Sequence, residues 1–66
     1  MLEIEVGQKA VIVASEEFDF HSFKVGEVVE FCEYGIFQEE DNYYEYKFVN
    51  DSGLHQLLVK EDFELL

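Results

Sequence analysis

Apolar and polar residues alternate along several short segments of this chain, and glycines lie between the segments. Over residues 1–6 the apolar side chains take every second position, which is the period of a strand with one buried face. Residues 43–49, YYEYKFV, are dense in strand-forming residues and place Tyr44, Tyr46 and Phe48 on one face. Short strands at this spacing, with turns between them, predict an all-β domain.

The same pattern predicts where each strand and connection lies. Extended segments are expected over residues 1–6, 9–14, 25–34, 43–49, 54–59 and 63–66. An acidic, aromatic loop is expected at 15–22, a solvated connection at 35–42, a hairpin turn at 50–53 and a short break at 60–62. A helical face through the tail is the alternative to its last strands, but the hairpin turn directly upstream favours strands. That alternative face would contain Leu54, Leu57, Leu58, Glu61 and Leu65.

The length limits the number of domains, because 66 residues make one domain, 1–66, with one small core. Hydrophobic residues make up 48% of the chain, which is too many for a disordered protein. A chain of this size has no room for a large enclosed substrate cavity.

Residues 22–31, SFKVGEVVEF, resemble the diverging-turn segment of Src homology 3 domains. Upstream, AVIVASEEFDF is similar to the first strand and acidic loop of that family, and downstream SGLHQLLVKEDFELL is similar to its last hairpin and closing strand. The resemblance covers nearly the whole chain. It implies a small five-stranded Src homology 3-like barrel with a short one-turn helix, residues 59–63, before the last strand. It also implies that Phe23 is buried and that Gly26 lets the chain reverse, since glycine adopts conformations that a Cβ disfavours.

The family's members that bind proline-rich peptides carry a Trp, a Pro and a Tyr that this chain lacks at the matching places. The chain has no Trp and no Pro at all, so the resemblance does not imply a proline-binding groove. Phe18, Phe20 and Tyr34 are left as candidates to line some other groove. Fold alone does not define function. A tiny, strongly acidic, single-domain chain is similar to small bacteriophage accessory proteins.

Charge excludes several classes of partner. The chain carries 16 acidic residues against four lysines, for a formal net charge of −12. Contact with nucleic-acid phosphates or with an anionic membrane requires clustered cations, so we expect neither direct nucleic-acid binding nor membrane binding. A protein with a basic surface is the expected partner, because opposite charges speed encounter. The alternative is that the carboxylates only keep a small protein soluble.

Aromatic residues beside acidic runs are the candidate interface, because such side chains anchor protein contacts. The alternatives are that the aromatics fill the core and that the carboxylates form an ordinary solvated surface. The candidate protein-binding residues are Glu16, Glu17, Phe18, Asp19, Phe20, Glu39, Glu40, Asp41, Tyr43 and Tyr44. The expected core residues are Phe23, Val29, Phe31, Phe48 and Leu58.

Residues with catalytic or metal-binding chemistry are few. Cys32 lies between Glu30 and Glu33, which disfavour a reactive thiolate. His21 and His55 lack the spacing of a zinc site, and we expect no metal, no cofactor and no enzymatic activity. One cysteine allows no internal disulfide, and the first residues do not resemble a signal peptide, so a cytoplasmic location is expected.

Three functional hypotheses remain from different classes. The first is a non-enzymatic acidic binding protein, encoded by a bacteriophage, that modulates or inhibits a basic, nucleic-acid-handling protein. The alternative is a structural or assembly module that self-associates through a barrel edge or through the aromatic strand at 43–49. A small ligand-binding protein or enzyme is a third interpretation, which bound metal or metabolite in the purified protein would favour.

Overall fold

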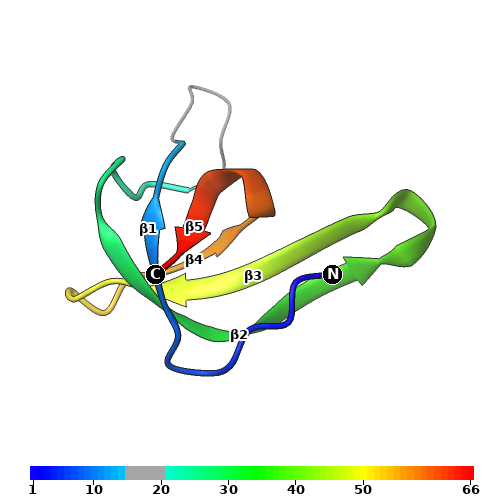
Figure 1. Cartoon of the computed structure of the whole chain (residues 1–66), viewed down its shortest axis with the longest axis horizontal. Coiled ribbons are helices and arrows are strands. Elements are labelled where there is room, and N and C mark those ends of the chain that lie inside the picture. Colours follow the sequence, from blue (N-terminus) through cyan, green and yellow to red (C-terminus); the bar gives the residue numbers. More distant parts are fainter. Residues whose placement is uncertain (15–20) are drawn as a thin grey trace.

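The computed structural model describes residues 1–14 and 21–66, which form one antiparallel sheet of five strands (Figure 1). The strand order is β4-β3-β2-β1-β5. A 3₁₀ turn, η1 (Glu39–Asp41), joins β2 to β3, and a second, η2 (Lys60–Asp62), precedes β5. The strands are β1 (Lys9–Ile12), β2 (Val28–Gln38), β3 (Tyr43–Val49), β4 (His55–Leu58) and β5 (Phe63–Leu65). The all-β prediction is therefore confirmed for this part of the chain.

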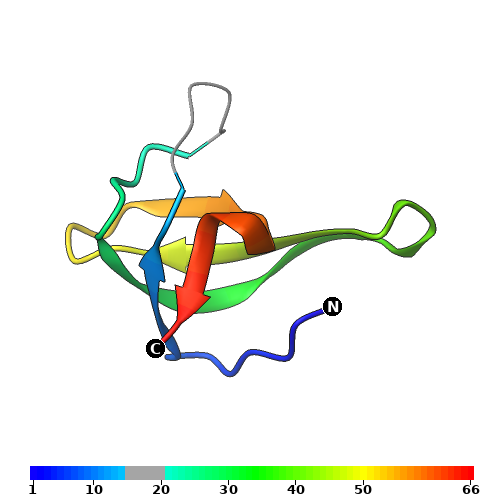
Figure 2. The same cartoon turned by 45° about the horizontal axis from the view of Figure 1, so that its top comes forward.

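The sheet coils around its core without closing (Figure 2). Phe63 of β5 packs on β3, with ring-centroid distances of 4.6 Å to Phe48 and 5.6 Å to Tyr46. In the sheet, β1 and β2 separate these two strands, so the sheet must curl strongly to bring the rings together. Within residues 1–14 and 21–66, β4 and β5 remain the two edges of the sheet, and the hydrogen-bonded strands form no closed barrel.

The core contains every residue that the sequence predicts for it. Phe23, Val29, Phe31, Phe48 and Leu58 are each at most 2% exposed. The other buried hydrophobic residues are Ile4, Ala10, Ile12, Tyr46 and Phe63. On β3, Tyr46 and Phe48 are buried and Tyr44 is partly buried against them, as the alternation along this strand predicts.

The two predicted reversals also form. Gly26 has a φ of +92°, which a side chain disfavours, and its N–H donates to the Ile12 carbonyl at 2.8 Å. In the β3–β4 turn, the Gly53 N–H donates to the Asn50 carbonyl at 3.0 Å. The Asn50 side-chain oxygen accepts the N–H groups of Ser52 and Leu54, which is a common role of Asn in turns.

The strand predicted over residues 1–6 is wrong. These residues, the N-terminal segment, form no strand, and only Ile4 is buried, whereas Val6 is 78% exposed. The Leu2 N–H donates to the Tyr46 hydroxyl at 2.9 Å, and the Ile4 N–H donates to the Tyr34 hydroxyl at 2.8 Å. Two side-chain hydroxyls therefore satisfy backbone groups that a neighbouring strand would otherwise satisfy.

β2 differs from its predicted bounds at both ends. It begins at Val28 rather than at residue 25, and it continues to Gln38 through the region predicted as a connection. Gly35 lies inside this strand, where an added Cβ would come within 2.8 Å of Leu57 Cδ2. This glycine therefore permits close packing of a neighbouring side chain instead of starting a loop.

The tail follows the predicted strands, and the alternative helical face is wrong. Residues 55–58 pair with β3, and residues 63–65 pair with β1. The short break predicted at 60–62 is the 3₁₀ turn η2. The loop predicted at 15–22 falls mainly on residues 15–20, which lie outside the described residues.

Candidate protein-binding surface

The outer part of the β2–β3 hairpin, residues 34–45, extends well beyond the rest of the sheet (Figures 1 and 2). We call it the arm. Within it, Phe37 pairs with Tyr44 and Gln38 pairs with Tyr43. The register shifts between Tyr34 and Phe37, which indicates a bulge, and bulges bend and twist a ribbon. The arm therefore places its tip away from the core.

A short 3₁₀ turn closes the tip of the arm. Asn42 takes the left-handed conformation, with a φ of 52°, and its N–H donates to the Glu39 carbonyl at 3.1 Å. Asn tolerates this conformation better than most residues with a side chain. The turn exposes the carboxylates of Glu39, Glu40 and Asp41 together.

A line of aromatic rings connects the core to the arm. The ring-centroid distances are 5.0 Å from Phe31 to Tyr34, 5.3 Å from Tyr34 to Phe37 and 5.8 Å from Phe37 to Tyr44. Phe37 and Tyr43 are 44% and 40% exposed. Ring contacts of this kind restrict the side chains, so the exposed Phe37 is held in place before any partner binds.

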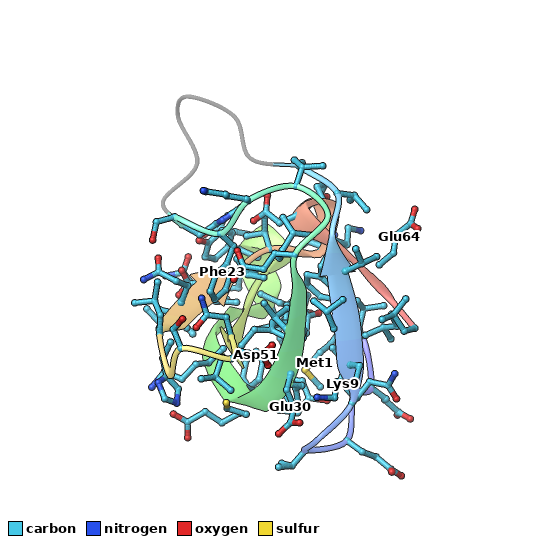
Figure 3. All side chains as sticks on the ribbon, turned by 90° about the vertical axis from the view of Figure 1, so that its left-hand side faces the viewer. Met1, Lys9, Phe23, Glu30, Asp51 and Glu64 are labelled. Atoms are coloured by element: carbon cyan, nitrogen blue, oxygen red, sulfur yellow. The ribbon has the colours of Figure 1, made fainter. Side chains whose placement is uncertain are left out.

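The charges at the tip of the arm are not neutralised by lysine. Lys9 pairs with Glu30 at 3.1 Å, and Lys47 pairs with Glu33 at 3.0 Å. Both pairs lie on the body of the sheet, and Figure 3 shows the Lys9 and Glu30 labels side by side there. Among the described residues, no cation lies within ion-pair distance of the three tip carboxylates. The tip therefore presents unpaired negative charge.

A groove of about 350 Å³ lies beside the β3 side of the arm. Three tyrosines, Tyr43, Tyr44 and Tyr46, line it together with Asn42. Residues 1–2 and residues 59–61 complete its walls. The groove thus depends on the N-terminal segment, which the hydroxyls of Tyr34 and Tyr46 hold against the sheet.

One hydrogen bond fixes the exposed Tyr43 side chain at the edge of the groove. Its hydroxyl donates to Glu45 Oε2 at 3.0 Å. Partial burial, together with this hydrogen bond to the carboxylate, raises the pKa of Tyr43. Tyr43 is therefore a neutral phenol at physiological pH, with its polar end occupied and its ring available for contact.

The histidines and the cysteine have roles in local structure. His21 is buried, its Nε2 lies 3.0 Å from the Ala14 carbonyl, and its Nδ1 accepts the Phe23 N–H at 3.2 Å. Partial burial raises the pKa of the Cys32 thiol, and the nearby negative charges of Glu30 and Glu33 raise it further. The positive charge of Lys47 lowers this pKa but does not cancel the rise. Residues 1–14 and 21–66 contain no group of three His, Cys, Asp or Glu side chains placed to hold a metal ion. In the same residues, we find no helix with the length and apolar character needed to cross a membrane.

Half of the predicted interface residues can be placed. Glu39, Glu40, Asp41, Tyr43 and Tyr44 all belong to the arm. The two tyrosines among them differ in burial: Tyr43 is exposed, whereas Tyr44 is partly buried. The remaining candidates lie outside the described residues: Glu16, Glu17, Phe18, Asp19 and Phe20.

The candidate protein-binding residues omit Ile36 and Phe37, which are 56% and 44% exposed on the arm. The polar, acidic run at residues 38–42 predicts a solvated connection over this segment. The apolar residues that continue after Tyr34 were the available signal for a longer strand. The wall of the groove at residues 59–61 carried no sequence signal of its own.

Comparisons of the chain with protein-family models, with curated proteins and with solved structures find no match. What the chain binds must therefore be inferred from the chemistry of the arm and the groove.

Proposed function

We propose that this is a non-enzymatic acidic binding protein that modulates or inhibits a protein with a basic surface, with the arm as its docking element. The observation that carries the proposal is the combination of three unpaired carboxylates at the tip with exposed Phe37 and Tyr43 beside them. Carboxylates speed the encounter with a basic surface, and aromatic side chains contribute most of the contact energy once it forms.

The proposed partner is a protein that handles nucleic acid. Such proteins carry clustered Lys and Arg to grip phosphates, and an acidic arm can occupy that surface. The net charge of −12 supports this choice and opposes direct contact with nucleic acid. We further propose that the coiled sheet is of the Src homology 3-like barrel type, and that the protein is phage-encoded and acts in the cytoplasm. The order of its turns and its last hairpin supports the first of these proposals.

A pull-down from bacterial lysate with matched charge variants tests the proposal. The arm variant is Glu39→Gln with Glu40→Gln, and the control is Asp51→Asn with Glu64→Gln. Figure 3 shows Asp51 and Glu64 on different sides of the body of the sheet, and each variant removes the same two charges. We expect basic proteins to be captured, and we expect the arm variant to lose much of that capture while the control keeps it.

Salt supplies the second half of the test. The Debye length falls below about 10 Å above 0.1 M salt, so capture should weaken between about 0.05 M and about 0.3 M sodium chloride. Captured proteins that are neutral or acidic would contradict the proposal. Equal loss of capture by the arm variant and the control would show that the arm is not the docking element.

Self-association is the second candidate, and one observation favours it. β4 is an edge strand, and His55, Gln56, Leu57 and Leu58 include no Lys, Asp or Glu to discourage pairing with another strand. The net charge of −12 on each copy opposes such pairing. Sedimentation separates the two, because a monomer at high micromolar concentration rules out self-association as the function.

A further inference from the structure

β3 is longer than the strand that covers one of its edges. β4 pairs with β3 only from Tyr46 to Val49, in register with His55 to Leu58. Beyond Leu58 the chain leaves the sheet and turns into η2. Among the described residues, no strand therefore lies beside residues 43–45 of β3, which belong to the arm, on the β4 side (Figure 1).

The backbone of Tyr44 faces this free edge. The Asn50 N–H donates to the Leu54 carbonyl at 3.1 Å, which places the backbone groups of residue 50 on the β4 side. In an antiparallel strand the N–H and C=O groups of alternate residues point to the same side. Residues 48, 46 and 44 follow residue 50 in that alternation. Tyr44 thus offers one donor and one acceptor where β4 no longer reaches.

The free edge adjoins the groove beside the arm. Tyr43, Tyr44 and residues 59–61 line that groove, so a strand added beside Tyr44 has space for a side chain next to it. Backbone hydrogen bonds give such strand addition its affinity, and pockets for alternate side chains give it specificity. The backbone groups of Tyr44 can supply the hydrogen bonds, and the adjoining groove can supply the pocket.

The charges around this edge favour an occupant with a positive charge. Glu61 lies in the groove wall, and the unpaired carboxylates of Glu39, Glu40 and Asp41 lie at the tip of the same arm. Lys60 is the one cationic side chain in the described groove lining. A second copy of this chain is disfavoured, because two chains of net charge −12 repel each other.

We propose that the free edge of β3 at Tyr44 binds an extended, positively charged segment of the partner protein, which adds to the sheet in line with β4. The sign of the segment's charge rests on the proposed function, whereas its extended conformation rests on the backbone of Tyr44. The segment donates one N–H to the Tyr44 carbonyl and accepts the Tyr44 N–H, and it places a side chain in the groove.

Selection from a displayed library of random peptides of about ten residues, with the full chain as bait, tests this inference, because a strand of that length exceeds the free edge. We expect the selected peptides to be rich in Lys and Arg and in strand-forming residues. Methylation of the backbone nitrogens at alternate residues of a selected peptide then separates strand addition from other modes. One alternate set faces β3, so methylating it should weaken binding about tenfold or more, and methylating the other set should have little effect.

Amide hydrogen exchange locates the site independently of the peptide's sequence. The Tyr44 amide should exchange fast in the free protein and slow down when the peptide binds. The Lys47 amide faces β2 in the same alternation and is protected in both states. The exposed pair of variants Lys60→Ala and Glu61→Gln should change affinity in opposite directions, tighter for the first and weaker for the second.

The inference is overturned if no peptide is selected, if methylation of either set has equal effect, or if Tyr44 exchange does not change. Selected peptides without an excess of basic residues would overturn it as well. Failure of this inference is distinguishable from failure of the proposed function. If the arm variant loses lysate capture but no peptide pairs at Tyr44, the arm is still the docking element, and only the strand addition is refuted.

Discussion

Removing the tyrosine hydroxyls that hold the N-terminal segment should loosen one wall of the groove. The Tyr46 hydroxyl accepts the Leu2 N–H at 2.9 Å. The Tyr34 hydroxyl accepts the Ile4 N–H at 2.8 Å and lies within donating distance of the Leu2 and Ile4 carbonyls, at 3.1 and 3.3 Å. The variants Tyr34→Phe and Tyr46→Phe delete these bonds and keep both rings.

The expected loss follows from the number of bonds deleted. A net contribution of about 1 kcal/mol for each hydrogen bond gives ~1 kcal/mol for Tyr46→Phe and ~1–2 kcal/mol for Tyr34→Phe. In a domain of this size, 1 kcal/mol lowers Tm by roughly 4–8 °C. The double variant should lose less than the sum, because both hydroxyls hold the same segment.

Urea unfolding measures the loss, and amide exchange at Leu2 and Ile4 shows whether the segment is the part released. Tyr43→Phe is the matched control, since its hydroxyl bonds to Glu45 at an exposed site and its removal should cost less than about 0.5 kcal/mol. If both variants unfold at the urea concentration of the wild type, and Leu2 and Ile4 exchange as before, the hydroxyls do not hold the segment.

Three further predictions concern single positions. Gly26→Ala should cost about 1–2 kcal/mol in urea unfolding from its positive φ of +92° alone, because no atom of the described residues lies within 4 Å of the added Cβ; unchanged stability would contradict this. Hydrogen bonds from the Lys24 N–H and then the Asn50 side chain lower the pKa of Glu27, so its stabilisation is present above its ordinary pKa and is lost as pH falls through the lowered folded value. Glu27→Gln should therefore flatten the loss of stability between about pH 5 and pH 3, and identical acid unfolding curves would count against it. The raised pKa of Cys32 should make it react with a disulfide reagent more slowly in the folded protein at pH 8 than in urea, and equal rates would refute the effect.

The sequence by itself determined the elements whose causes are local. β3 begins and ends where the alternation of YYEYKFV predicts, since its turn signal at 50–53 and its buried face both lie within a few residues. Gly26 lets the chain reverse as expected, and its positive φ is a conformation that a Cβ disfavours. Phe31 is buried because it lies on the inward face of β2, and Phe23 is buried as the Src homology 3 resemblance implies.

Tertiary structure decided the features that depend on distant partners. Residues 1–6 alternate as a strand does, yet their N–H groups bond to tyrosine hydroxyls 30 and 44 positions away, which no local pattern encodes. In the sequence, Gly35 cannot be told from a glycine that forms a turn. In the structure it lies inside β2 with Leu57 packed against it, and the strand continues past it into the arm. The groove and the free edge at Tyr44 arise because β4 ends before β3 does. Strand ends are set by where the chain can find a partner in space, and the alternation along one segment cannot specify where its neighbour stops.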